Sequence, residues 1–338
     1  MAGSGNQGIR RIWKSARESS IFNIFIVVIV LCLTASIFSK YFLDFYNLQS
    51  LVRDMAFLGL ITLGQALLLI LGELDLSLGK ISALCGVLGG IFMVHLNINP
   101  YVAILLSLAA GFAFGLINGL LVTKLRLNSL VVTIGMSGVF GGFNLVFTHG
   151  QAITNIPKSI YFLGQGYLMN IPTPFIIMIV IAILVIFFTK FTKSGRYIYA
   201  IGNSREASLI LGIRVNRIRT LTFAFAGLLA AIAGILMVAK LGTSQPGIGE
   251  SWPLNSIAGS VIGGVSLLGG VGGPLGALLG IFVILVIQNM IVLFGVSPYW
   301  QTVVSGIIVV VAIAFDSIST MISEYNVRKM VEGKTKAE

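Results

Sequence analysis

Two carboxylates and a hydroxyl lie close together in an otherwise apolar part of the sequence. Glu73, Asp75 and Ser77 alternate with leucines, and Gly72 and Gly79 bound the run. Burying a charge in hydrocarbon is costly, so ionisable groups beside apolar stretches are candidate functional groups. Asp75 or Ser77 can cap a helix by accepting backbone N–H groups, or the same groups can line a water-filled pathway. Both interpretations stay open and are compatible, because a capping carboxylate can also face a cavity.

Amide side chains make up most of the other polar groups inside the apolar stretches. They are Gln65, Asn118, Asn144, Asn255, Gln288 and Asn289. Each amide can join two helices by a hydrogen bond or line a pore, and the sequence does not separate these alternatives. Uncharged donors and acceptors suit a neutral, hydroxyl-rich solute better than an ion.

Motifs that would indicate catalysis are absent from the sequence. It contains no Gly-x-x-x-x-Gly-Lys phosphate-binding loop, no Cys cluster and no paired His residues. Cys32 and Cys85 lie in apolar stretches and are interpreted as small packing residues. We predict that the chain is not an enzyme and binds no cofactor or metal. Intramembrane carboxylates of the kind used by pumps are scarce, which favours an external source of energy.

The composition indicates an integral membrane protein. Hydrophobic residues make up 57% of the 338 residues and charged residues 10%, whereas about a quarter of a soluble domain is charged. The net charge of +11 does not indicate nucleic-acid binding, because the Lys and Arg residues lie in the gaps between apolar stretches. We therefore expect no nucleic-acid partner.

About ten apolar stretches are long enough, or nearly so, to cross a bilayer as helices. We predict an all-α membrane protein that forms a single domain over residues 1–338. The first stretch follows a basic segment, as in a signal peptide, but its length favours a retained helix. The eighth and tenth stretches are short, which predicts tilted or broken helices. The predicted spans are 21–39, 51–71, 76–95, 100–122, 129–148, 174–191, 220–240, 254–270, 274–294 and 298–315.

The distribution of basic residues predicts the orientation. With the N-terminus in the cytoplasm, seventeen Lys and Arg residues fall in or beside cytoplasmic segments and four fall outside. Positive charges concentrate on the cytoplasmic side of membrane proteins, so both termini are predicted to be cytoplasmic. The main cytoplasmic segments are then 1–20, 192–219 and 316–338.

A weak internal repeat divides the predicted spans. Gly72-Glu73 and Gly249-Glu250 each head a Gly-rich apolar stretch, and Asn118 and Gly135 recur as Asn289 and Gly306 at a constant offset. Spans 2–5 begin outside and spans 7–10 begin inside in the predicted topology. This arrangement predicts two inverted repeats, which place a pathway at their interface.

Small residues also recur at four-residue spacing, which puts a smooth ridge on one face of a helix. This pattern favours close helix packing, and a sliding surface of a gate is the alternative. The ridges are Gly111, Gly115 and Gly119; Ser82, Gly86 and Gly90; and Gly272, Gly276 and Gly280.

The segment 192–219 is both basic and partly apolar. Asn203 or Ser204 can cap a short helix that carries Glu206 in its first turn and ends at Gly212. A solvated loop would explain the charges but not the apolar run from Leu209 to Ile213. A short helix that docks on a partner explains both.

Four motifs in order resemble the membrane permease subunit of bacterial ABC importers for monosaccharides such as ribose, xylose, galactose and arabinose. The resemblance covers about residues 20–320. The run 72–79 is similar to the family's Gly-Gly-Ile-Asp-Leu-Ser-Val-Gly, and 195–213 to its Gly-Arg-x-x-x-Ala-x-Gly loop ending in Gly-Ile. The segment 262–270 is similar to Gly-Gly-x-Ser-x-x-Gly-Gly, and 295–301 to a Gly-Val run that ends in Gln.

The resemblance implies an importer that takes up a sugar across the bacterial inner membrane. The implied partners are an ATP-binding subunit with two nucleotide-binding modules, an extracytoplasmic binding protein, a second permease copy or paralogue, and membrane lipid. A permease for a nucleoside or another small polar solute is the alternative within this class. A self-contained secondary transporter is the alternative from a different class.

The resemblance also suggests roles for individual residues. The predicted substrate pathway consists of Asp75, Ser77, Asn118 and Asn255. The sequence departs from the family pattern at Glu73, where Gly is frequent, and at Asn255, where Asp is frequent. The residues predicted to couple the permease to the ATPase are Gly202, Asn203, Glu206, Leu211 and Gly212.

Overall fold

The structure, a computed structural model, describes residues 20–297, 299–311, 313–314, 318 and 321. Of the predicted cytoplasmic ends, 1–20 and 316–338, only residues 20, 318 and 321 lie within the described part. Apart from links and turns, the described chain is helical, with two short antiparallel strands, β1 (Tyr167–Leu168) and β2 (Ile171–Pro172). The helices are α2 (Ser20–Phe38), α3 (Phe45–Ile70), α4 (Leu78–Gly90, continued by a π-helical turn Ile91–His95), α5 (Pro100–Lys124), α6 (Ser129–Thr148), α7 (Tyr161–Gln165, preceded by a 3-10 turn Lys158–Ile160), α8 (Thr173–Phe191), α9 (Lys193–Asn203), α10 (Arg205–Ile210), α11 (Val215–Leu241), α12 (Trp252–Ile262) and α13 (Pro274–Leu293).

The prediction of a multi-pass helical membrane protein is confirmed. Seven helices are long and apolar enough to cross a bilayer: α3, α4 with its π-helical turn, α5, α6, α8, α11 and α13. Two shorter apolar helical stretches match the first and tenth predicted spans. They are Phe22–Phe38, which is part of α2, and Tyr299–Val311. The eighth predicted span, 254–270, is helical only as far as Ile262. Gly264, Gly269 and Gly270 follow with positive φ angles, which end the helix early.

Local sequence signals explain where several helices begin. Asn99 and Asn128 occupy the N-cap positions of α5 and α6, and each side chain accepts a backbone N–H two residues further on. Asp44 caps α3 in the same way. These polar caps satisfy backbone donors that have no partner within the helix. Because they lie at the edges of the apolar stretches, the predicted ends of these spans are accurate to within a few residues, except at the start of α3.

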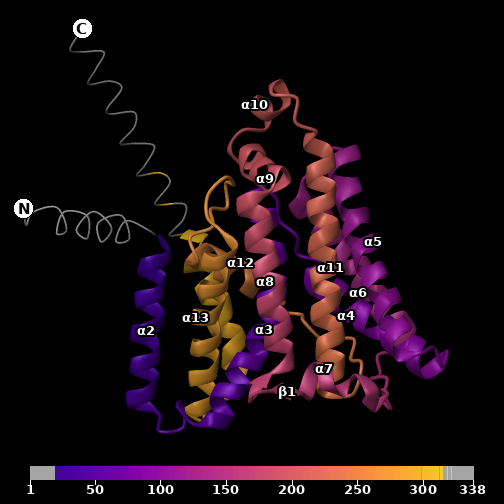
Figure 1. Cartoon of the computed structure of the whole chain (residues 1–338), viewed down its shortest axis with the longest axis vertical. Helices are drawn as coiled ribbons and strands as arrows, with labels where there is room; N and C mark the ends of the chain where they lie inside the picture. The colour runs from indigo at the N-terminus through magenta and orange to yellow at the C-terminus, as the bar shows by residue number, and fades with distance from the viewer. Residues whose placement is uncertain (1–19, 298, 312, 315–317, 319–320, 322–338) are drawn as a thin grey trace, which may run out of the picture.

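The order of elements repeats along the chain. A long helix, a non-helical link, a short helix and a longer helix occur as α3, 71–77, α4 and α5, and again as α11, 242–251, α12 and α13. The two sets interlock: α11 packs against α4 and α5, while α3 packs against α12 and α13. Figure 1 shows this core of neighbouring, roughly aligned helices, with α9 and α10 at the upper end and α7 and β1 at the lower end.

The small-residue ridge of α5 allows its close approach to α11. A Cβ atom at Gly111, Gly115 or Gly119 would overlap backbone or side-chain atoms of α11, including the carbonyl oxygen of Phe223. The ridge at Gly276 and Gly280 lies against α12 and the following turn in the same way. The packing interpretation of these two ridges is therefore confirmed.

The two non-helical links enter the helix bundle. The segment 242–251 runs beside α4: the Ser244 hydroxyl donates to the carbonyl of Gly86 at 3.0 Å, and further on Gly249 meets Gly79. A Cβ atom at Gly79 would overlap the carbonyl oxygen of Gly249. Irregular backbone is tolerated at membrane depth where it is buried in protein or lines a cavity. The first link thus brings Glu73 and Asp75 between the apolar helices.

Candidate functional site

The first link, 71–77, ends in a closed network of polar side chains. Asp75 Oδ1 accepts hydrogen bonds from the Ser77 backbone N–H at 2.8 Å and from the Ser77 hydroxyl at 2.6 Å. The Asn118 amide donates to Asp75 Oδ2 at 3.1 Å and to Ser77 Oγ at 2.8 Å. All three side chains have an exposed fraction of 0%. The structure therefore joins three of the four predicted pathway residues, but in a sealed cluster that positions the start of α4.

Asn255, the fourth predicted pathway residue, forms no hydrogen bond with this cluster among the described residues. It lies on α12 and is 2% exposed. Its side-chain oxygen is buried and has no hydrogen-bond partner in the described part of the chain. Such an atom is costly to bury, so Asn255 remains a candidate for contact with water or solute.

Glu73 forms a buried ion pair with Arg219, near the start of α11. Arg219 Nε donates to Glu73 Oε1 at 2.6 Å, and Arg219 Nη2 contacts the same oxygen. The side chains are 6% and 10% exposed for Arg219 and Glu73, respectively. The sequence placed Arg219 in a basic cytoplasmic segment, but α11 begins at Val215 and carries it into the bundle. The buried carboxylate of Glu73 is thus paired with the guanidinium group of Arg219.

A second ion pair joins the two repeated halves at the surface of the bundle. Lys80 Nζ lies 3.0 Å from Glu250 Oε1, and the Glu250 side chain is 76% exposed. A Cβ atom at Gly141 of α6 would touch the aliphatic part of Lys80, and Asn144 of α6 donates to the Lys80 carbonyl at 3.4 Å. This pair was not among the residues predicted for the pathway. Its signal in the sequence was the recurrence of Gly-Glu at the head of both repeats.

A polar cavity of about 400 Å³ lies between α3 and α13, with Met237 of α11 and Trp252 of α12 also in its lining. Its polar lining includes Gln288 and Asn289 of α13, two of the amides singled out in the sequence. Asn289 exchanges hydrogen bonds with Asn47 at 2.8 and 3.1 Å, and Gln288 donates to Ser305 at 3.0 Å. The lining residues are Tyr46, Asn47, Ser50, Leu51, Asp54, Phe57, Leu58, Met237, Trp252, Leu285, Gln288, Asn289, Val292 and Gln301.

Aromatic and charged groups complete this cavity. The rings of Phe57 and Trp252 stack with centroids 6.5 Å apart. Asp54 accepts a hydrogen bond from Lys240 at 2.6 Å. Stacked rings, amides and one carboxylate offer an apolar face together with several hydrogen-bonding groups, which is the usual make-up of a small-molecule site.

The helix α9 meets the bundle where the two halves touch. The backbone N–H of Gly270 donates to the carbonyl of Ile70, the last residue of α3, at 2.8 Å. A Cβ atom at Gly202 would overlap that carbonyl oxygen and crowd the Gly270 nitrogen, and the Asn203 side chain lies directly against Gly270. The end of α9 therefore contacts both α3 and the turn that follows α12.

Tyr199 makes a further contact from α9. Its hydroxyl donates to the carbonyl of Gly272 at 3.1 Å. Burial raises the pKa of the Tyr199 phenol above its ordinary value, so the hydroxyl keeps its proton at neutral pH. The α9 helix is thus tied to the segment 263–273 at two places.

The helix α10 forms as expected and extends away from the bundle (Figure 1). Ser204 is its N-cap and accepts the Ala207 N–H at 3.2 Å, while Glu206 lies in its first turn. Gly212 has a φ of 75°, a conformation that favours glycine, and ends the helix. Leu209, Ile210 and Leu211 are 56%, 86% and 77% exposed. Of the predicted coupling residues, Gly202 and Asn203 lie in the bundle contact, and the others lie on this projection.

Within the described residues, no group of three or more His, Cys, Asp or Glu side chains could hold a metal ion. Glu73, Glu250 and Asp54 are each paired with a Lys or Arg side chain, and Asp75 is held by uncharged donors. The arrangement offers a polar cavity, three ion pairs between the two repeated sets of helices, and a projecting apolar tip, which suit binding and movement rather than catalysis.

Comparison with known proteins gives a consistent result along almost the whole chain. Residues 47–313 match the family model described as branched-chain amino acid transport system / permease component. The ribose import permease protein of Bacillus subtilis (strain 168) is 37% identical over 86% of this chain and 91% of its own length.

Two further relatives also match over most of both chains. The ribose import permease protein of Escherichia coli (strain K12) is 31% identical over 93% of this chain and 97% of its own length. The autoinducer 2 import system permease protein of Enterobacter sp. (strain 638) is 32% identical over 81% of this chain and 80% of its own length. No solved structure matches the chain. The family model matches residues 47–313, which is most of the chain and includes the ion pairs, the cavity and the α9–α10 projection. The chain therefore belongs to the family of branched-chain amino acid transport system permease components.

Proposed function

We propose that the protein is the permease subunit of an ATP-binding-cassette importer that takes up a sugar. The observation that carries this proposal is the match, over most of both chains, to ribose import permeases. The cavity lined by amides, Trp252 and Phe57 supports a neutral, hydroxyl-rich solute, because amides can donate to and accept from hydroxyl groups.

The proposed topology has ten crossings with both chain ends in the cytoplasm. The basic segment 192–219 lies at the α9–α10 end, and Lys240 and Lys158 belong to elements near α7 at the opposite end (Figure 1). This distribution of basic residues supports placing the α9–α10 end in the cytoplasm, because positive charges concentrate on that side. The short helix α12 together with its non-helical flanks then makes the eighth crossing.

A second permease copy would complete the pathway. Gly135, Gly138 and Gly142 on α6 have no neighbouring atom within 4 Å of a Cβ position. Small residues on an open helix face allow another helix to approach closely within a membrane. Gly141 of the same helix lies near the side chain of Lys80, so the Lys80–Glu250 pair is beside this face. We place the pathway between two copies here, with the charged pair at its wall and Asn255 and the Asp75 cluster behind it.

Reconstitution tests this function. The permease in liposomes with its ATP-binding subunit and its binding protein is expected to accumulate ribose when ATP is supplied to the ATPase side. Omitting either partner is expected to abolish uptake, because this chain supplies neither ATP hydrolysis nor solute capture. Uptake by the permease alone would contradict the proposal and favour a secondary transporter. A nucleoside and autoinducer 2, tested in the same assay, distinguish the solute classes.

Docking of the ATP-binding subunit is proposed at the tip of α10. An exposed run of three apolar residues at a polar end of a protein is typical of an interaction site. Leu211→Asp is expected to weaken binding of the ATP-binding subunit by about tenfold or more, because buried apolar anchors dominate protein interfaces. Co-purification at graded salt concentrations measures this loss.

The matched control for this variant is Leu168→Asp in β1, which is 48% exposed at the opposite end of the molecule. It introduces the same charge and is expected to leave binding unchanged. Equal binding by the wild-type protein and Leu211→Asp would show that α10 is not the docking site.

A further inference from the structure

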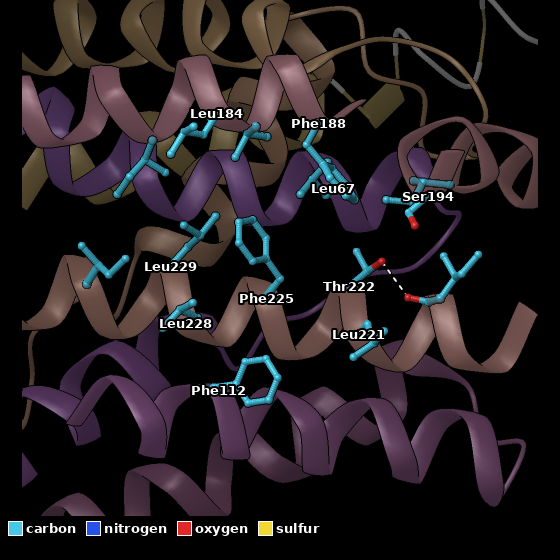
Figure 2. A pocket seen from close by; sticks show the side chains of 15 residues that line it. Leu67, Phe112, Leu184, Phe188, Ser194, Leu221, Thr222, Phe225, Leu228 and Leu229 are labelled. Atoms are coloured by element: carbon cyan, nitrogen blue, oxygen red, sulfur yellow. Dashed lines mark hydrogen bonds between the residues drawn. The ribbon is translucent and has the colours of Figure 1, made fainter. Parts of the chain in front are cut away.

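A deep apolar groove separates α8 from α11, apart from the polar cavity and the charged pairs described above. Its volume is about 520 Å³. Figure 2 shows Leu184 and Phe188 of α8 opposite Phe225 and Leu229 of α11, with Leu67 of α3 behind them. Thirteen of the fifteen lining residues are apolar, and the two others, Ser194 and Thr222, carry only hydroxyl groups.

The groove opens toward the outside of the helix bundle. Leu184 and Leu221, on its two walls, are 61% and 47% exposed, and Phe112 of α5 is 38% exposed. The Thr222 hydroxyl is already satisfied by the carbonyl of Ile218 at 2.8 Å. A surface groove at membrane depth with no free polar group in its walls, apart from the hydroxyl at its end, accepts a hydrocarbon chain.

One end of the groove is bounded by α9 and is surrounded by positive charge. Ser194 and Ile198 of α9 line this end. Lys193 directly precedes Ser194, and Arg217 lies one helical turn before Leu221 on the same face of α11. Lys190 and Arg214 lie at the adjoining ends of α8 and α11, and all four cations are exposed. None of the four belongs to an ion pair among the described residues.

The charge at this end identifies the occupant. An acyl chain gains little from leaving the lipid for an apolar groove, because both surroundings are equally apolar. Discrimination between lipids must therefore come from the headgroup, and a phosphate forms strong charge-assisted hydrogen bonds with Lys and Arg. We propose that the groove binds an acyl chain of an anionic phospholipid and that Lys193 and Arg217 hold its headgroup.

The position of the site gives the lipid a role beyond solvation. The same helix α9 that closes the groove through Ser194 and Ile198 also contacts α3 at Gly202 and carries α10. A lipid seated against Ser194 would hold α9 against α8 and α11. This inference concerns binding to the permease alone and does not rest on the proposed transport function.

Native mass spectrometry of the purified full-length permease tests the site, with phosphatidylglycerol and phosphatidylcholine as probes. We expect phosphatidylglycerol to be retained more strongly. Lys193→Gln combined with Arg217→Gln is expected to weaken its retention more than tenfold, because each cation near a headgroup contributes a factor of about five. Lys40→Gln with Lys158→Gln removes the same charge at other places and is expected to change nothing.

A second pair of variants tests the groove itself. Leu221→Trp places a large side chain in the groove and is expected to abolish retention of phosphatidylglycerol. Leu105→Trp, at a position on α5 that is 66% exposed and outside the groove, is the matched control. Equal retention of the two lipids, or full retention by Leu221→Trp, would overturn the proposal. Disulfide formation between two copies carrying Leu184→Cys would overturn it too, since a second copy would then fill the groove.

Discussion

Replacing Arg219 by Met is expected to lower the free energy of unfolding by about 3–5 kcal/mol. The substitution leaves the Glu73 carboxylate buried in the bundle without the cation that contacts it. Glu73 is 9% exposed as a residue, so water cannot replace the lost contact. Thermal unfolding of the purified protein in one detergent, with wild type and variant side by side, measures the loss.

Two controls separate this effect from a general sensitivity to substitution. The double variant Arg219→Met with Glu73→Gln removes both charges and is expected to recover most of the stability, because uncharged groups are less costly to bury. Lys240→Met breaks a more exposed pair with Asp54 and is expected to cost less than about 1 kcal/mol. If Arg219→Met were as stable as wild type, the ion pair would not stabilise the link to α11.

Replacing Gly202 by Ala is expected to uncouple the ATPase from solute movement. The added Cβ atom would overlap the Ile70 carbonyl oxygen, which accepts the Gly270 N–H. Both neighbours are backbone atoms, so α9 itself must shift. Overpacking of this kind costs about 1–3 kcal/mol, which changes an equilibrium between two conformations by a factor of about 5–150. Uptake is expected to fall by such a factor while the ATPase remains active.

The measurement for Gly202→Ala compares uptake with ATP hydrolysis in the same reconstituted vesicles. Gly247→Ala adds the same methyl group where no atom lies within 4 Å, and it is expected to leave both activities unchanged. A proportional loss of uptake and hydrolysis in Gly202→Ala would indicate failed assembly. Unchanged uptake would show that the contact of α9 with Ile70 does not transmit movement.

The predictability of the fold differs between its regular and its irregular parts. The predicted spans 100–122 and 129–148 agree closely with α5 and α6, because Asn99 and Asn128 cap these helices and apolar residues fill them. The predicted span 254–270 was too long by eight residues at its end. Hydropathy does not change where α12 ends at Ile262, and the turns at Gly269 and Gly270 lie against Ile70 at the end of α3 and against Gly202 and Asn203 of α9, which are distant in sequence.

The predictability of the site differs in the same way. The helix α10 was predicted from its cap, its acidic first turn and Gly212, which are local signals. The pair of Lys80 with Glu250 was not predicted, because 170 residues separate the partners and each is an ordinary charge by itself. The amides of Asn289 and Asn47 are likewise far apart in sequence, and only the approach of α13 to α3 makes them line one cavity.

The apolar stretches and the caps therefore determine by themselves that this chain is a multi-pass helical membrane protein with a short helix, α10, between two of its spans. These features depend on the transfer of side chains into hydrocarbon and on hydrogen bonds within a few residues, both of which are local. Tertiary structure alone decided that Glu73 meets Arg219, that Asp75 is sealed with Asn118, and that a cation-rimmed groove opens between α8 and α11. These features need helices from distant parts of the chain to pack together, and neither hydropathy nor spacing encodes which faces will meet.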